Sequence, residues 1–395
     1  MACPSGKSLS GGVPKLRCEV NSQRLDVEAQ RVPPIEGDTV SAFPKHEMAG
    51  AESMDTGGRK PEVSVIIPIR NEGEQIKECL ESLRVQTYLK EGMEILLVDG
   101  MSVDDTRGRI NEFLASTDGQ IPSVRILENP VGQRAAGLNI GIRAARGNVI
   151  ARVDARTVVP RDYIEKCVWA LTETGADNVG GVQRPIAKTI TQEAIGIALS
   201  HPFGVANARF RLGKKSGFVD TVYLGCFRRE VFEKVGLFDE DASVISEDSD
   251  MNQRIREAGG KVYLDSDIEA FYYPRETLKD FWRLYFRYGG ARAGNFLKHR
   301  RLTSWRQAAP VFVLVLAILG VLSFVNSVFL ALLLALTSLY VAVDAVISMR
   351  LAIGRRKLGL FRTLLLAFPC IHFGYGLGFW KRLLIPDRTG IYWRD

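Results

Sequence analysis

The sequence predicts an α/β domain with a largely parallel sheet, followed by a C-terminal membrane region. Short β-branched runs alternate with segments of helical apolar spacing between residues 63 and 153, a pattern typical of a doubly wound sheet. Further along, the stretch 308–348 is almost uninterrupted Val, Leu, Ala, Ile and Phe, with Asp344 as its one charged residue. That stretch is too long for a core helix and fits two membrane helices of about 20 residues each.

Strands and helices are expected in turn through the first half of the α/β domain. The expected strands cover 63–68, 94–99, 124–127 and 149–153, and the helices between them cover 73–86, a segment opening at 104–106, and 132–146. Beyond Pro160 the alternation loosens, and we expect helices at 161–172, 230–235 and 251–258 with strand-like runs at 177–183 and 224–229. The long segment from 184 to 223 receives no assigned element.

Three of the expected strands end in acidic or amide residues. Asn71 and Glu72 follow the first strand, Asp99 closes the second, and Asp154 follows the fourth. The carboxyl ends of parallel strands share one edge of a sheet, where α/β proteins bind ligands, so three such ends predict a pocket for a polar ligand. The first strand is not followed by Gly-x-Gly-x-x-Gly and the chain has no Walker loop, which argues against a dinucleotide or P-loop site.

Asp154 is the first candidate for function, although its neighbours allow a second interpretation. Residues two apart on an extended segment share a face, so Arg152, Asp154 and Arg156 could form a plain ion-pair ladder. Such networks perturb carboxylates without any catalytic role. Both interpretations stay open at this level.

An acidic run at 246–250 opens the helix expected at 251–258 and contains Glu247, Asp248 and Asp250. Carboxylates in the first turn of a helix are common partners of its dipole. Three within four residues repel one another, however, and such a cluster usually meets a cation or a proton.

Positive charge flanks the long apolar stretch on both sides, within a chain of formal net charge +7. Basic residues lie at 298–301 and 306 before the stretch and at 350 and 355–357 after it. The positive-inside rule therefore places both flanks and the large N-terminal domain in the cytoplasm. Nucleic acid is not an expected partner, because these cations gather at membrane flanks rather than among aromatic residues on a compact domain.

A third apolar stretch, 358–380, contains Arg362, Pro369, His372 and a Gly-rich run at 374–378. We expect it to span the membrane, with a re-entrant segment as the alternative. A span would leave the basic residues at 381, 382 and 388 on the side that the rule disfavours. The segment 278–306 mixes aromatic residues with arginines and is expected to be an interfacial helix with a basic linker.

The ends of the chain and its cysteines add little to the functional prediction. Residues 1–60 are rich in Gly, Ser, Pro and charge and are expected to form a disordered extension, and 385–395 form a C-terminal tail. The six cysteines form no Cys-x-x-Cys pair, which argues against zinc and fits reduced thiols in the cytosol.

Taken together, these motifs resemble the inverting glycosyltransferases of family 2 over about residues 61–298. The resemblance implies a GT-A fold, with a Rossmann-like mixed sheet at 61–277. Family members carry Pro-x-x-Asn-Glu, here Pro68-Ile-Arg-Asn-Glu72, whose residues line the nucleotide pocket, and a Val-Asp strand end, here Val98-Asp99, on the uridine. Asn139 belongs to the matching Ala-x-x-x-Asn-x-Gly segment.

The same resemblance implies roles for the acidic groups. Asp154 corresponds to the first aspartate of Asp-x-Asp, which meets the ribose and the metal, whereas Arg156 replaces the second. A Mg²⁺ or Mn²⁺ ion held by Asp154 alone is therefore expected, or a phosphate contact by Arg156 in its place. Within the pair Glu247-Asp248 the resemblance assigns the catalytic base, with Asp248 preferred and Asp250 as the fallback.

Two further motifs are matched in part. Arg287-Tyr288 represents the diphosphate-contacting Gln-x-x-Arg-Trp motif incompletely, which counts against a processive synthase, and Gly225 with Arg228 and Arg229 matches the acceptor-side loop.

The variant motifs and the short membrane tail look like the exopolysaccharide subgroup typified by the succinoglycan glucosyltransferase. The expected enzyme transfers a hexose, glucose first, from a UDP-sugar to a polyprenyl-diphosphate-linked oligosaccharide. It would be a multi-pass protein of the inner membrane with its catalytic domain in the cytoplasm and polysaccharide-assembly proteins among its partners. Alternatives are a polyprenyl-phosphate glycosyltransferase, a processive synthase, or a non-catalytic scaffold that binds nucleotide sugars.

Overall fold

The structure is a computed structural model that describes residues 62–88, 92–117, 121–213, 215–240, 247–299 and 308–385. The expected N-terminal extension, the end of the basic linker and nearly all of the C-terminal tail lie outside the described residues.

The described residues contain a mixed sheet of nine strands in the order β3-β2-β1-β4-β8-β6-β9-β5, with β7 paired to β9. The strands are β1 (Val63–Ile69), β2 (Met93–Asp99), β3 (Ser123–Glu128), β4 (Val149–Arg152), β5 (Thr157–Val158), β6 (Asn178–Pro185), β7 (Gly217–Phe218), β8 (Tyr223–Arg228) and β9 (Val262–Tyr272). β1 to β4 are mutually parallel, as predicted, whereas β8 is antiparallel to both β4 and β6. The mixed sheet of a GT-A fold is thereby confirmed.

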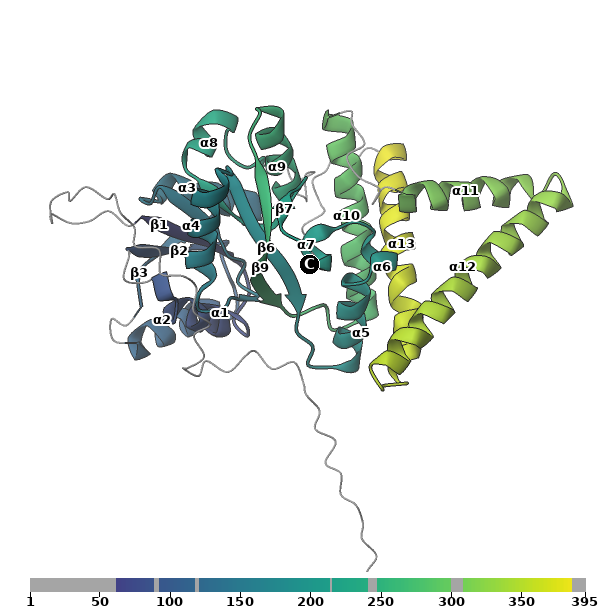
Figure 1. Ribbon diagram of the computed structural model, residues 1–395, viewed down its shortest axis with the longest axis horizontal. Helices are drawn as coiled ribbons and strands as arrows, with labels where there is room; N and C mark the ends of the chain where they lie inside the picture. The colour runs from purple at the N-terminus through teal and green to yellow at the C-terminus, as the bar shows by residue number, and fades with distance from the viewer. Residues whose placement is uncertain are drawn as a thin grey trace, which may run out of the picture.

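Helices cover both faces of the sheet (Figure 1). Successive residues of β1 point to opposite faces, so Val65 packs with α1 and α4 while Ile66 packs with α3. The helices of the two layers are α1 (Ile76–Arg84), α2 (Thr106–Ser116) and α4 (Tyr163–Thr174) on one face, and α3 (Arg134–Ala144), α8 (Glu230–Val235) and α9 (Glu247–Glu257) on the other. The acidic run therefore opens α9, as expected.

Sequence reasoning missed several elements between β6 and α10. These include the helices α5 (Ile190–Leu199), α6 (Pro202–Val205) and α7 (Arg209–Leu212), and the long strand β9. α6 and α7 have only four residues each, too few to show a helical period. They matter because α6 and α7 lie between the sheet and the C-terminal helices (Figure 1).

Four helices complete the chain: α10 (Leu278–His299), α11 (Ala308–Leu322), α12 (Ser327–Gly354) and α13 (Leu360–Leu384). α10 and α13 run side by side next to the α/β domain, while α11 and α12 project from it and meet at a distant tip (Figure 1). By length and composition, α12 and α13 could each cross a membrane, whereas α11 has only 15 residues. α13 is a continuous helix, with no break of the kind that a re-entrant segment needs.

Two aromatic residues of α10 are buried against its neighbouring helices. Phe281 and Tyr285 lie in a cluster with Leu364 and Phe368 of α13 and Ile195 of α5. Part of the apolar face of α10 therefore packs against other helices of the same chain. The interfacial position expected for 278–306 stays a prediction.

Glycines bring α10 and α13 into backbone contact. A Cβ atom placed on Gly289 would collide with the carbonyl oxygen of Tyr375, and one placed on Gly378 would collide with that of Phe286. Small residues at a helix crossing allow this close approach, which explains the Gly-rich run of the third apolar stretch. The contact fixes α13, one of the two helices that could cross a membrane, against α10.

Alanine substitutions should separate this contact from ordinary helix propensity. Gly378→Ala should destabilise the protein, roughly by 1–3 kcal/mol, because the methyl group overpacks the crossing. Gly320→Ala in α11 has no atom within 4 Å of its new Cβ and should instead stabilise, by up to about 1 kcal/mol. Unfolding midpoints in one detergent test this, and equal shifts of the two variants would contradict it.

Candidate active site

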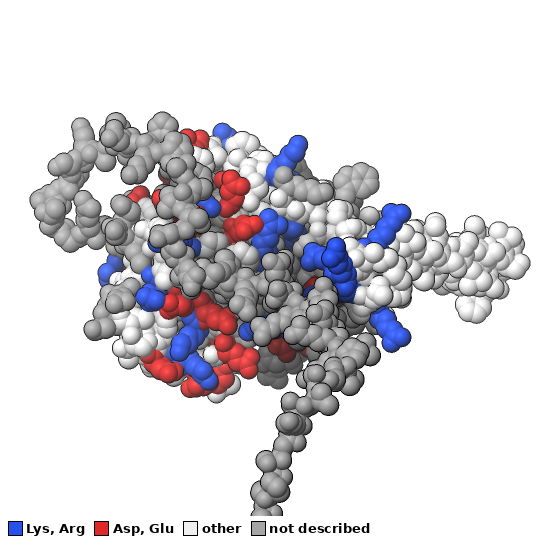
Figure 2. Space-filling view, turned by 60° about the horizontal axis from the view of Figure 1, so that its bottom comes forward, with Lys and Arg blue, Asp and Glu red and all other residues white. Residues whose placement is uncertain are grey.

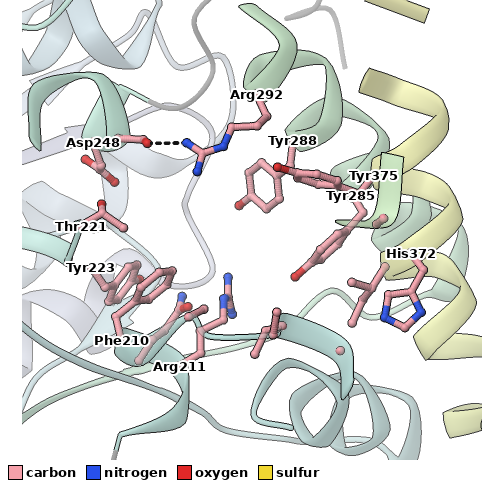
Figure 3. A pocket seen from close by; sticks show the side chains of 18 of the residues that line it. Phe210, Arg211, Thr221, Tyr223, Asp248, Tyr285, Tyr288, Arg292, His372 and Tyr375 are labelled. Carbon is pink, nitrogen blue, oxygen red and sulfur yellow. Dashed lines mark hydrogen bonds between the residues drawn. The ribbon is translucent and has the colours of Figure 1, made fainter. Parts of the chain in front are cut away.

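A cavity of about 480 Å³ lies where the carboxyl edge of the sheet meets the C-terminal helices. Its polar end is lined by Arg134, Arg152, Asp154, Glu247 and Asp248. Its opposite end is lined by aromatic and apolar side chains of α6, α11, α12 and α13, among them Phe203, Phe312, Tyr340, Ile371 and Tyr375. Figure 3 shows Asp248 on one side of this cavity and His372 and Tyr375 on the other.

The buried guanidinium of Arg152 organises the polar end. Arg152 closes β4, and its Nε donates to Asp154 Oδ1 at 2.8 Å. Its Nη2 donates to Glu247 Oε1 at 3.2 Å, and its Nη1 donates to Asp248. Of the ion-pair ladder that the sequence allows, the pair Arg152–Asp154 is therefore present. The same guanidinium also binds two carboxylates from the start of α9.

The pKa values of Asp154 and Asp248 shift in opposite directions. Burial raises the pKa of Asp154, but the positive charges of Arg152 and Arg134 outweigh burial and hold that pKa below its ordinary value. Burial raises the pKa of Asp248 to about 7, and Glu247 and Asp154 contribute to the rise while Arg152 opposes it. A carboxylate close to half protonated near neutrality can accept a proton, as a general base must.

Arg156 turns away from Asp154 and pairs with Glu72. Its Nε donates to Glu72 Oε2 at 2.6 Å, so the two expected donor residues meet at this edge. Burial lowers the pKa of Arg275, and repulsion from Arg156 and Arg287 lowers it further, so positive charge accumulates around Arg275. Such an accumulation suits an anionic ligand.

The other strand-end residues serve the loops that shape this edge. Asp99 is fully buried, accepts from the backbone N–H and hydroxyl of Ser102, and pairs with Arg107. Asn71 has a positive φ of 54° and accepts from the Val103 N–H at 2.9 Å. Pro68, in β1, lies close to Gly137 of α3. None of these three lines the cavity among the described residues.

Four expected site residues lie away from the cavity. Asn139 is buried and holds the segment after α8 through the backbone of Phe238. Gly225 has a φ of +104°, and a Cβ there would collide with the ring of Phe227. Arg228 pairs in register with Val149 at the start of β4, opposite the carboxyl edge. With Arg229 it donates to backbone carbonyls of 171, 176, 145 and 147, so these arginines stabilise loops and helix ends.

Asp250 is also separated from the cavity. Its side chain is fully buried and accepts from Arg254 Nε at 2.8 Å and from Lys298 Nζ at 2.7 Å. These bonds tie α9 to the end of α10. Glu247 and Asp248 therefore line the cavity, whereas Asp250, the alternative candidate for the base, holds α9 against α10.

Several cavity residues escaped the sequence analysis. Arg134 pairs with Glu247 at 3.3 Å, and Arg211, Tyr223 and Arg292 add to the polar wall. Tyr288, named above only as part of an incomplete motif, also lines the cavity. Arg134 follows directly on Gln133 at the N-cap of α3, so its position beside a matched motif was a usable signal. Arg211 lies on a four-residue helix, and its position depends on contacts that no local pattern encodes.

Asp154 is the carboxylate expected to hold a divalent ion at this edge. Among the described residues there is no cluster of three or more His, Cys, Asp or Glu side chains placed to hold a metal. Asp154 lines the cavity, and Mg²⁺ commonly keeps only one or two protein carboxylates beside waters and substrate phosphates. The donor set therefore fits a minimal site, provided that Arg152 releases an oxygen of Asp154.

Comparison with known proteins finds similarity to one family over part of the chain. Residues 64–236 match the family described as Glycosyl transferase family 2. The chain is 29% identical over 323 residues to the succinoglycan biosynthesis protein ExoA of Rhizobium meliloti, covering 81% of this chain and 94% of that protein. It is 28% identical over 236 residues to a dolichyl N-acetyl-alpha-D-glucosaminyl phosphate 3-beta-D-2,3-diacetamido-2,3-dideoxy-beta-D-glucuronosyltransferase of Methanococcus voltae, covering 58% and 72%.

A solved structure shares the fold. The mannosyltransferase PcManGT of Pyrobaculum calidifontis, solved with GDP-Man and Mn²⁺, matches with a TM-score of 0.58 at 20% sequence identity. The match covers 84% of this chain and 89% of that one.

Replacing Asp250 should affect stability and leave the cavity intact. Asp250→Asn should lower the free energy of unfolding by roughly 1–3 kcal/mol, because two charged hydrogen bonds lose their buried acceptor charge. The folded variant should still bind a nucleotide sugar with unchanged affinity in a calorimetric titration. A large loss of affinity at unchanged stability would instead assign Asp250 to the site.

Proposed function

We propose that this chain, a family 2 glycosyltransferase, transfers a hexose, with glucose as the first candidate, from a UDP-sugar to a polyprenyl-diphosphate-linked oligosaccharide in exopolysaccharide synthesis. The observation that carries the proposal is the shared cavity. The carboxylates of Asp154, Glu247 and Asp248 line one end, and side chains of the apolar helices α11, α12 and α13 line the other. Two similarities support a lipid-linked acceptor: one to a succinoglycan biosynthesis protein, and one to a transferase named for a dolichyl sugar phosphate.

The reaction assigned to Asp248 is a single displacement at the anomeric carbon. An acceptor hydroxyl oxygen forms the new bond to that carbon, while the bond from the carbon to the donor's β-phosphate oxygen breaks and UDP leaves with the electron pair. The Asp248 carboxylate takes the hydroxyl proton. Arg152 keeps Asp248 in place and stabilises its charged form, and Glu247 faces Arg134 and Arg152 as their counter-charge.

The donor's diphosphate has cations of its own at the edge near Glu72. Arg156 and Arg287 add positive charge around Arg275, and Arg134 lines the adjoining part of the cavity. A Mg²⁺ or Mn²⁺ ion on Asp154 would add positive charge to the leaving diphosphate. The fold is compatible with such an ion, since a structure of the same fold was solved with Mn²⁺.

The membrane position follows from the projecting helices. The apolar arm of α11 and α12 is white in Figure 2, and Lys and Arg side chains gather around its base. If the arm enters the membrane tip first, the exposed basic residues at 350 and 355–357 stay on the side of the α/β domain. Lys381 and Arg382 contact Phe286 and Gly290 of α10, so in this arrangement both ends of α13 lie on the side of the α/β domain. The proposed position therefore replaces the expected span of 358–380 by a helix that does not cross the membrane, and the conflict with the positive-inside rule does not arise.

An assay of UDP release tests the proposal. Purified protein in detergent is given lipid-linked acceptor extract, a panel of UDP-sugars and Mg²⁺ or Mn²⁺. One UDP-sugar should support release, and Asp248→Asn should reduce the rate by roughly 10²–10⁴-fold because the base is lost. No release with any donor would contradict the enzyme proposal, and full activity of Asp248→Asn would contradict the base assignment. Activity that survives a chelator would show that the guanidiniums suffice without the ion.

The pH dependence should report the raised pKa of Asp248. The base is active as the carboxylate, so kcat/KM should rise tenfold per pH unit below about 7 and level off above it. The rise follows deprotonation of Asp248, whose pKa burial raises. A profile that is flat between pH 5 and 8 would contradict this assignment, and the residual activity of Asp248→Asn provides the control.

A further inference from the structure

Two guanidiniums in the cavity lack a carboxylate partner among the described residues. Arg211 of α7 donates from Nη1 to the Tyr272 hydroxyl at 3.3 Å, and Arg292 of α10 donates from Nη1 to Ser249 Oγ at 3.0 Å. Both line the cavity, and Figure 3 shows the two side chains reaching into it from opposite sides.

The ion-pair partners of Arg152 and Arg134 distinguish those two arginines from Arg211 and Arg292. Arg152 meets three carboxylates and Arg134 meets Glu247, so those charges are balanced by the protein. Arg292 is 9% exposed and bonds only to a neutral hydroxyl in the described part of the chain. A buried cation is costly unless an anion accompanies it, which points to an anionic ligand between Arg211 and Arg292.

The wall beside these arginines is apolar. Four aromatic side chains form it, and two of them come from the projecting helices α11 and α12. The four are Phe203, Phe312, Tyr340 and Tyr375. None of these four side chains is charged, and the hydroxyl of Tyr340 shares a hydrogen bond of 2.9 Å with His372 Nδ1. A ligand that suits this end carries an anionic head for the arginines and an apolar tail for the wall. A nucleotide sugar is polar throughout and has other cations beside Glu72.

We propose that Arg211 and Arg292 bind the phosphate groups of the lipid-linked acceptor, and that the aromatic wall receives the first prenyl units of its tail. This inference rests on the proposed function and names the acceptor's subsite within it. Arginine forks match phosphate oxygens with paired hydrogen bonds. Because Arg292 also bonds Ser249, the neighbour of Asp248, the bound head group lies close to the base.

Binding of small probes tests this without requiring turnover. The full-length protein in detergent is titrated with geranylgeranyl diphosphate, geranylgeraniol, inorganic pyrophosphate and UDP, by calorimetry. Geranylgeranyl diphosphate should bind at least tenfold more tightly than the alcohol or pyrophosphate. Arg211→Gln and Arg292→Gln should each weaken that binding by about tenfold or more, since each removes charged hydrogen bonds, and should leave the affinity for UDP unchanged.

Matched variants keep the test decisive. Arg283→Gln, an exposed residue of α10 paired with Asp280, should change neither affinity. If a glutamine variant does not fold, Arg211→Lys and Arg292→Lys keep the charge but lose the fork, and an intermediate loss is expected.

The outcomes separate this inference from the proposed function. Unchanged prenyl diphosphate binding in the variants, or equal binding of the alcohol and the diphosphate, would overturn the inference. Loss of UDP binding with prenyl diphosphate unaffected would also overturn it, by assigning the pair to the donor. A wild-type protein that binds prenyl diphosphate through these arginines but transfers no sugar would contradict the proposed function alone.

Discussion

The contact between Arg152 and three carboxylates is the interaction on which the site depends. It joins the end of β4 to the start of α9, two elements almost a hundred residues apart, and it brings Asp154, Glu247 and Asp248 to one cavity. One guanidinium cannot balance three negative charges in a buried place. Burial, joined by the negative charges of Glu247 and Asp154, raises the pKa of Asp248 to about 7. Arg134 pairs with Glu247 and helps to lower the pKa of Asp154.

The C-terminal helices α10 to α13 also line this cavity. Gly289 and Gly378 let α10 and α13 touch along their backbones, and α10 also carries Tyr288 and Arg292 into the cavity. A shift of α13 would therefore move the cavity wall as well as the anchor. Under the proposed function, this arrangement gives a physical reason for joining catalysis and membrane attachment in one chain, because an acceptor held at the surface would meet the site at a raised effective concentration.

Much of the fold was predictable, because the alternation of buried strands with helices up to Val153 is strongly periodic. The antiparallel strands and α5 to α7 were not, since their order depends on contacts distant in sequence. In the site, residue type and strand-end position indicated Asp154, Glu72 and Asp99, and Asp99 bonds to the protein's own loop. The family resemblance indicated Asp248, which lines the cavity, and also Asn139 and Arg228, whose partners are backbone groups of the protein's own loops. A sequence pattern shows where a polar group lies along an element, and only the packing shows which partner it meets.

The most direct test of the account is the kinetic pKa of Asp248 in variants of Arg152. Arg152 opposes the rise in that pKa, so Arg152→Gln should move the midpoint of the kcat/KM profile upward by about one pH unit or more, with activity partly recovered at high pH. Arg152→Lys, which keeps the charge, should leave the midpoint near its wild-type value. A midpoint that is the same in Arg152→Gln and wild type would contradict the central role of this guanidinium.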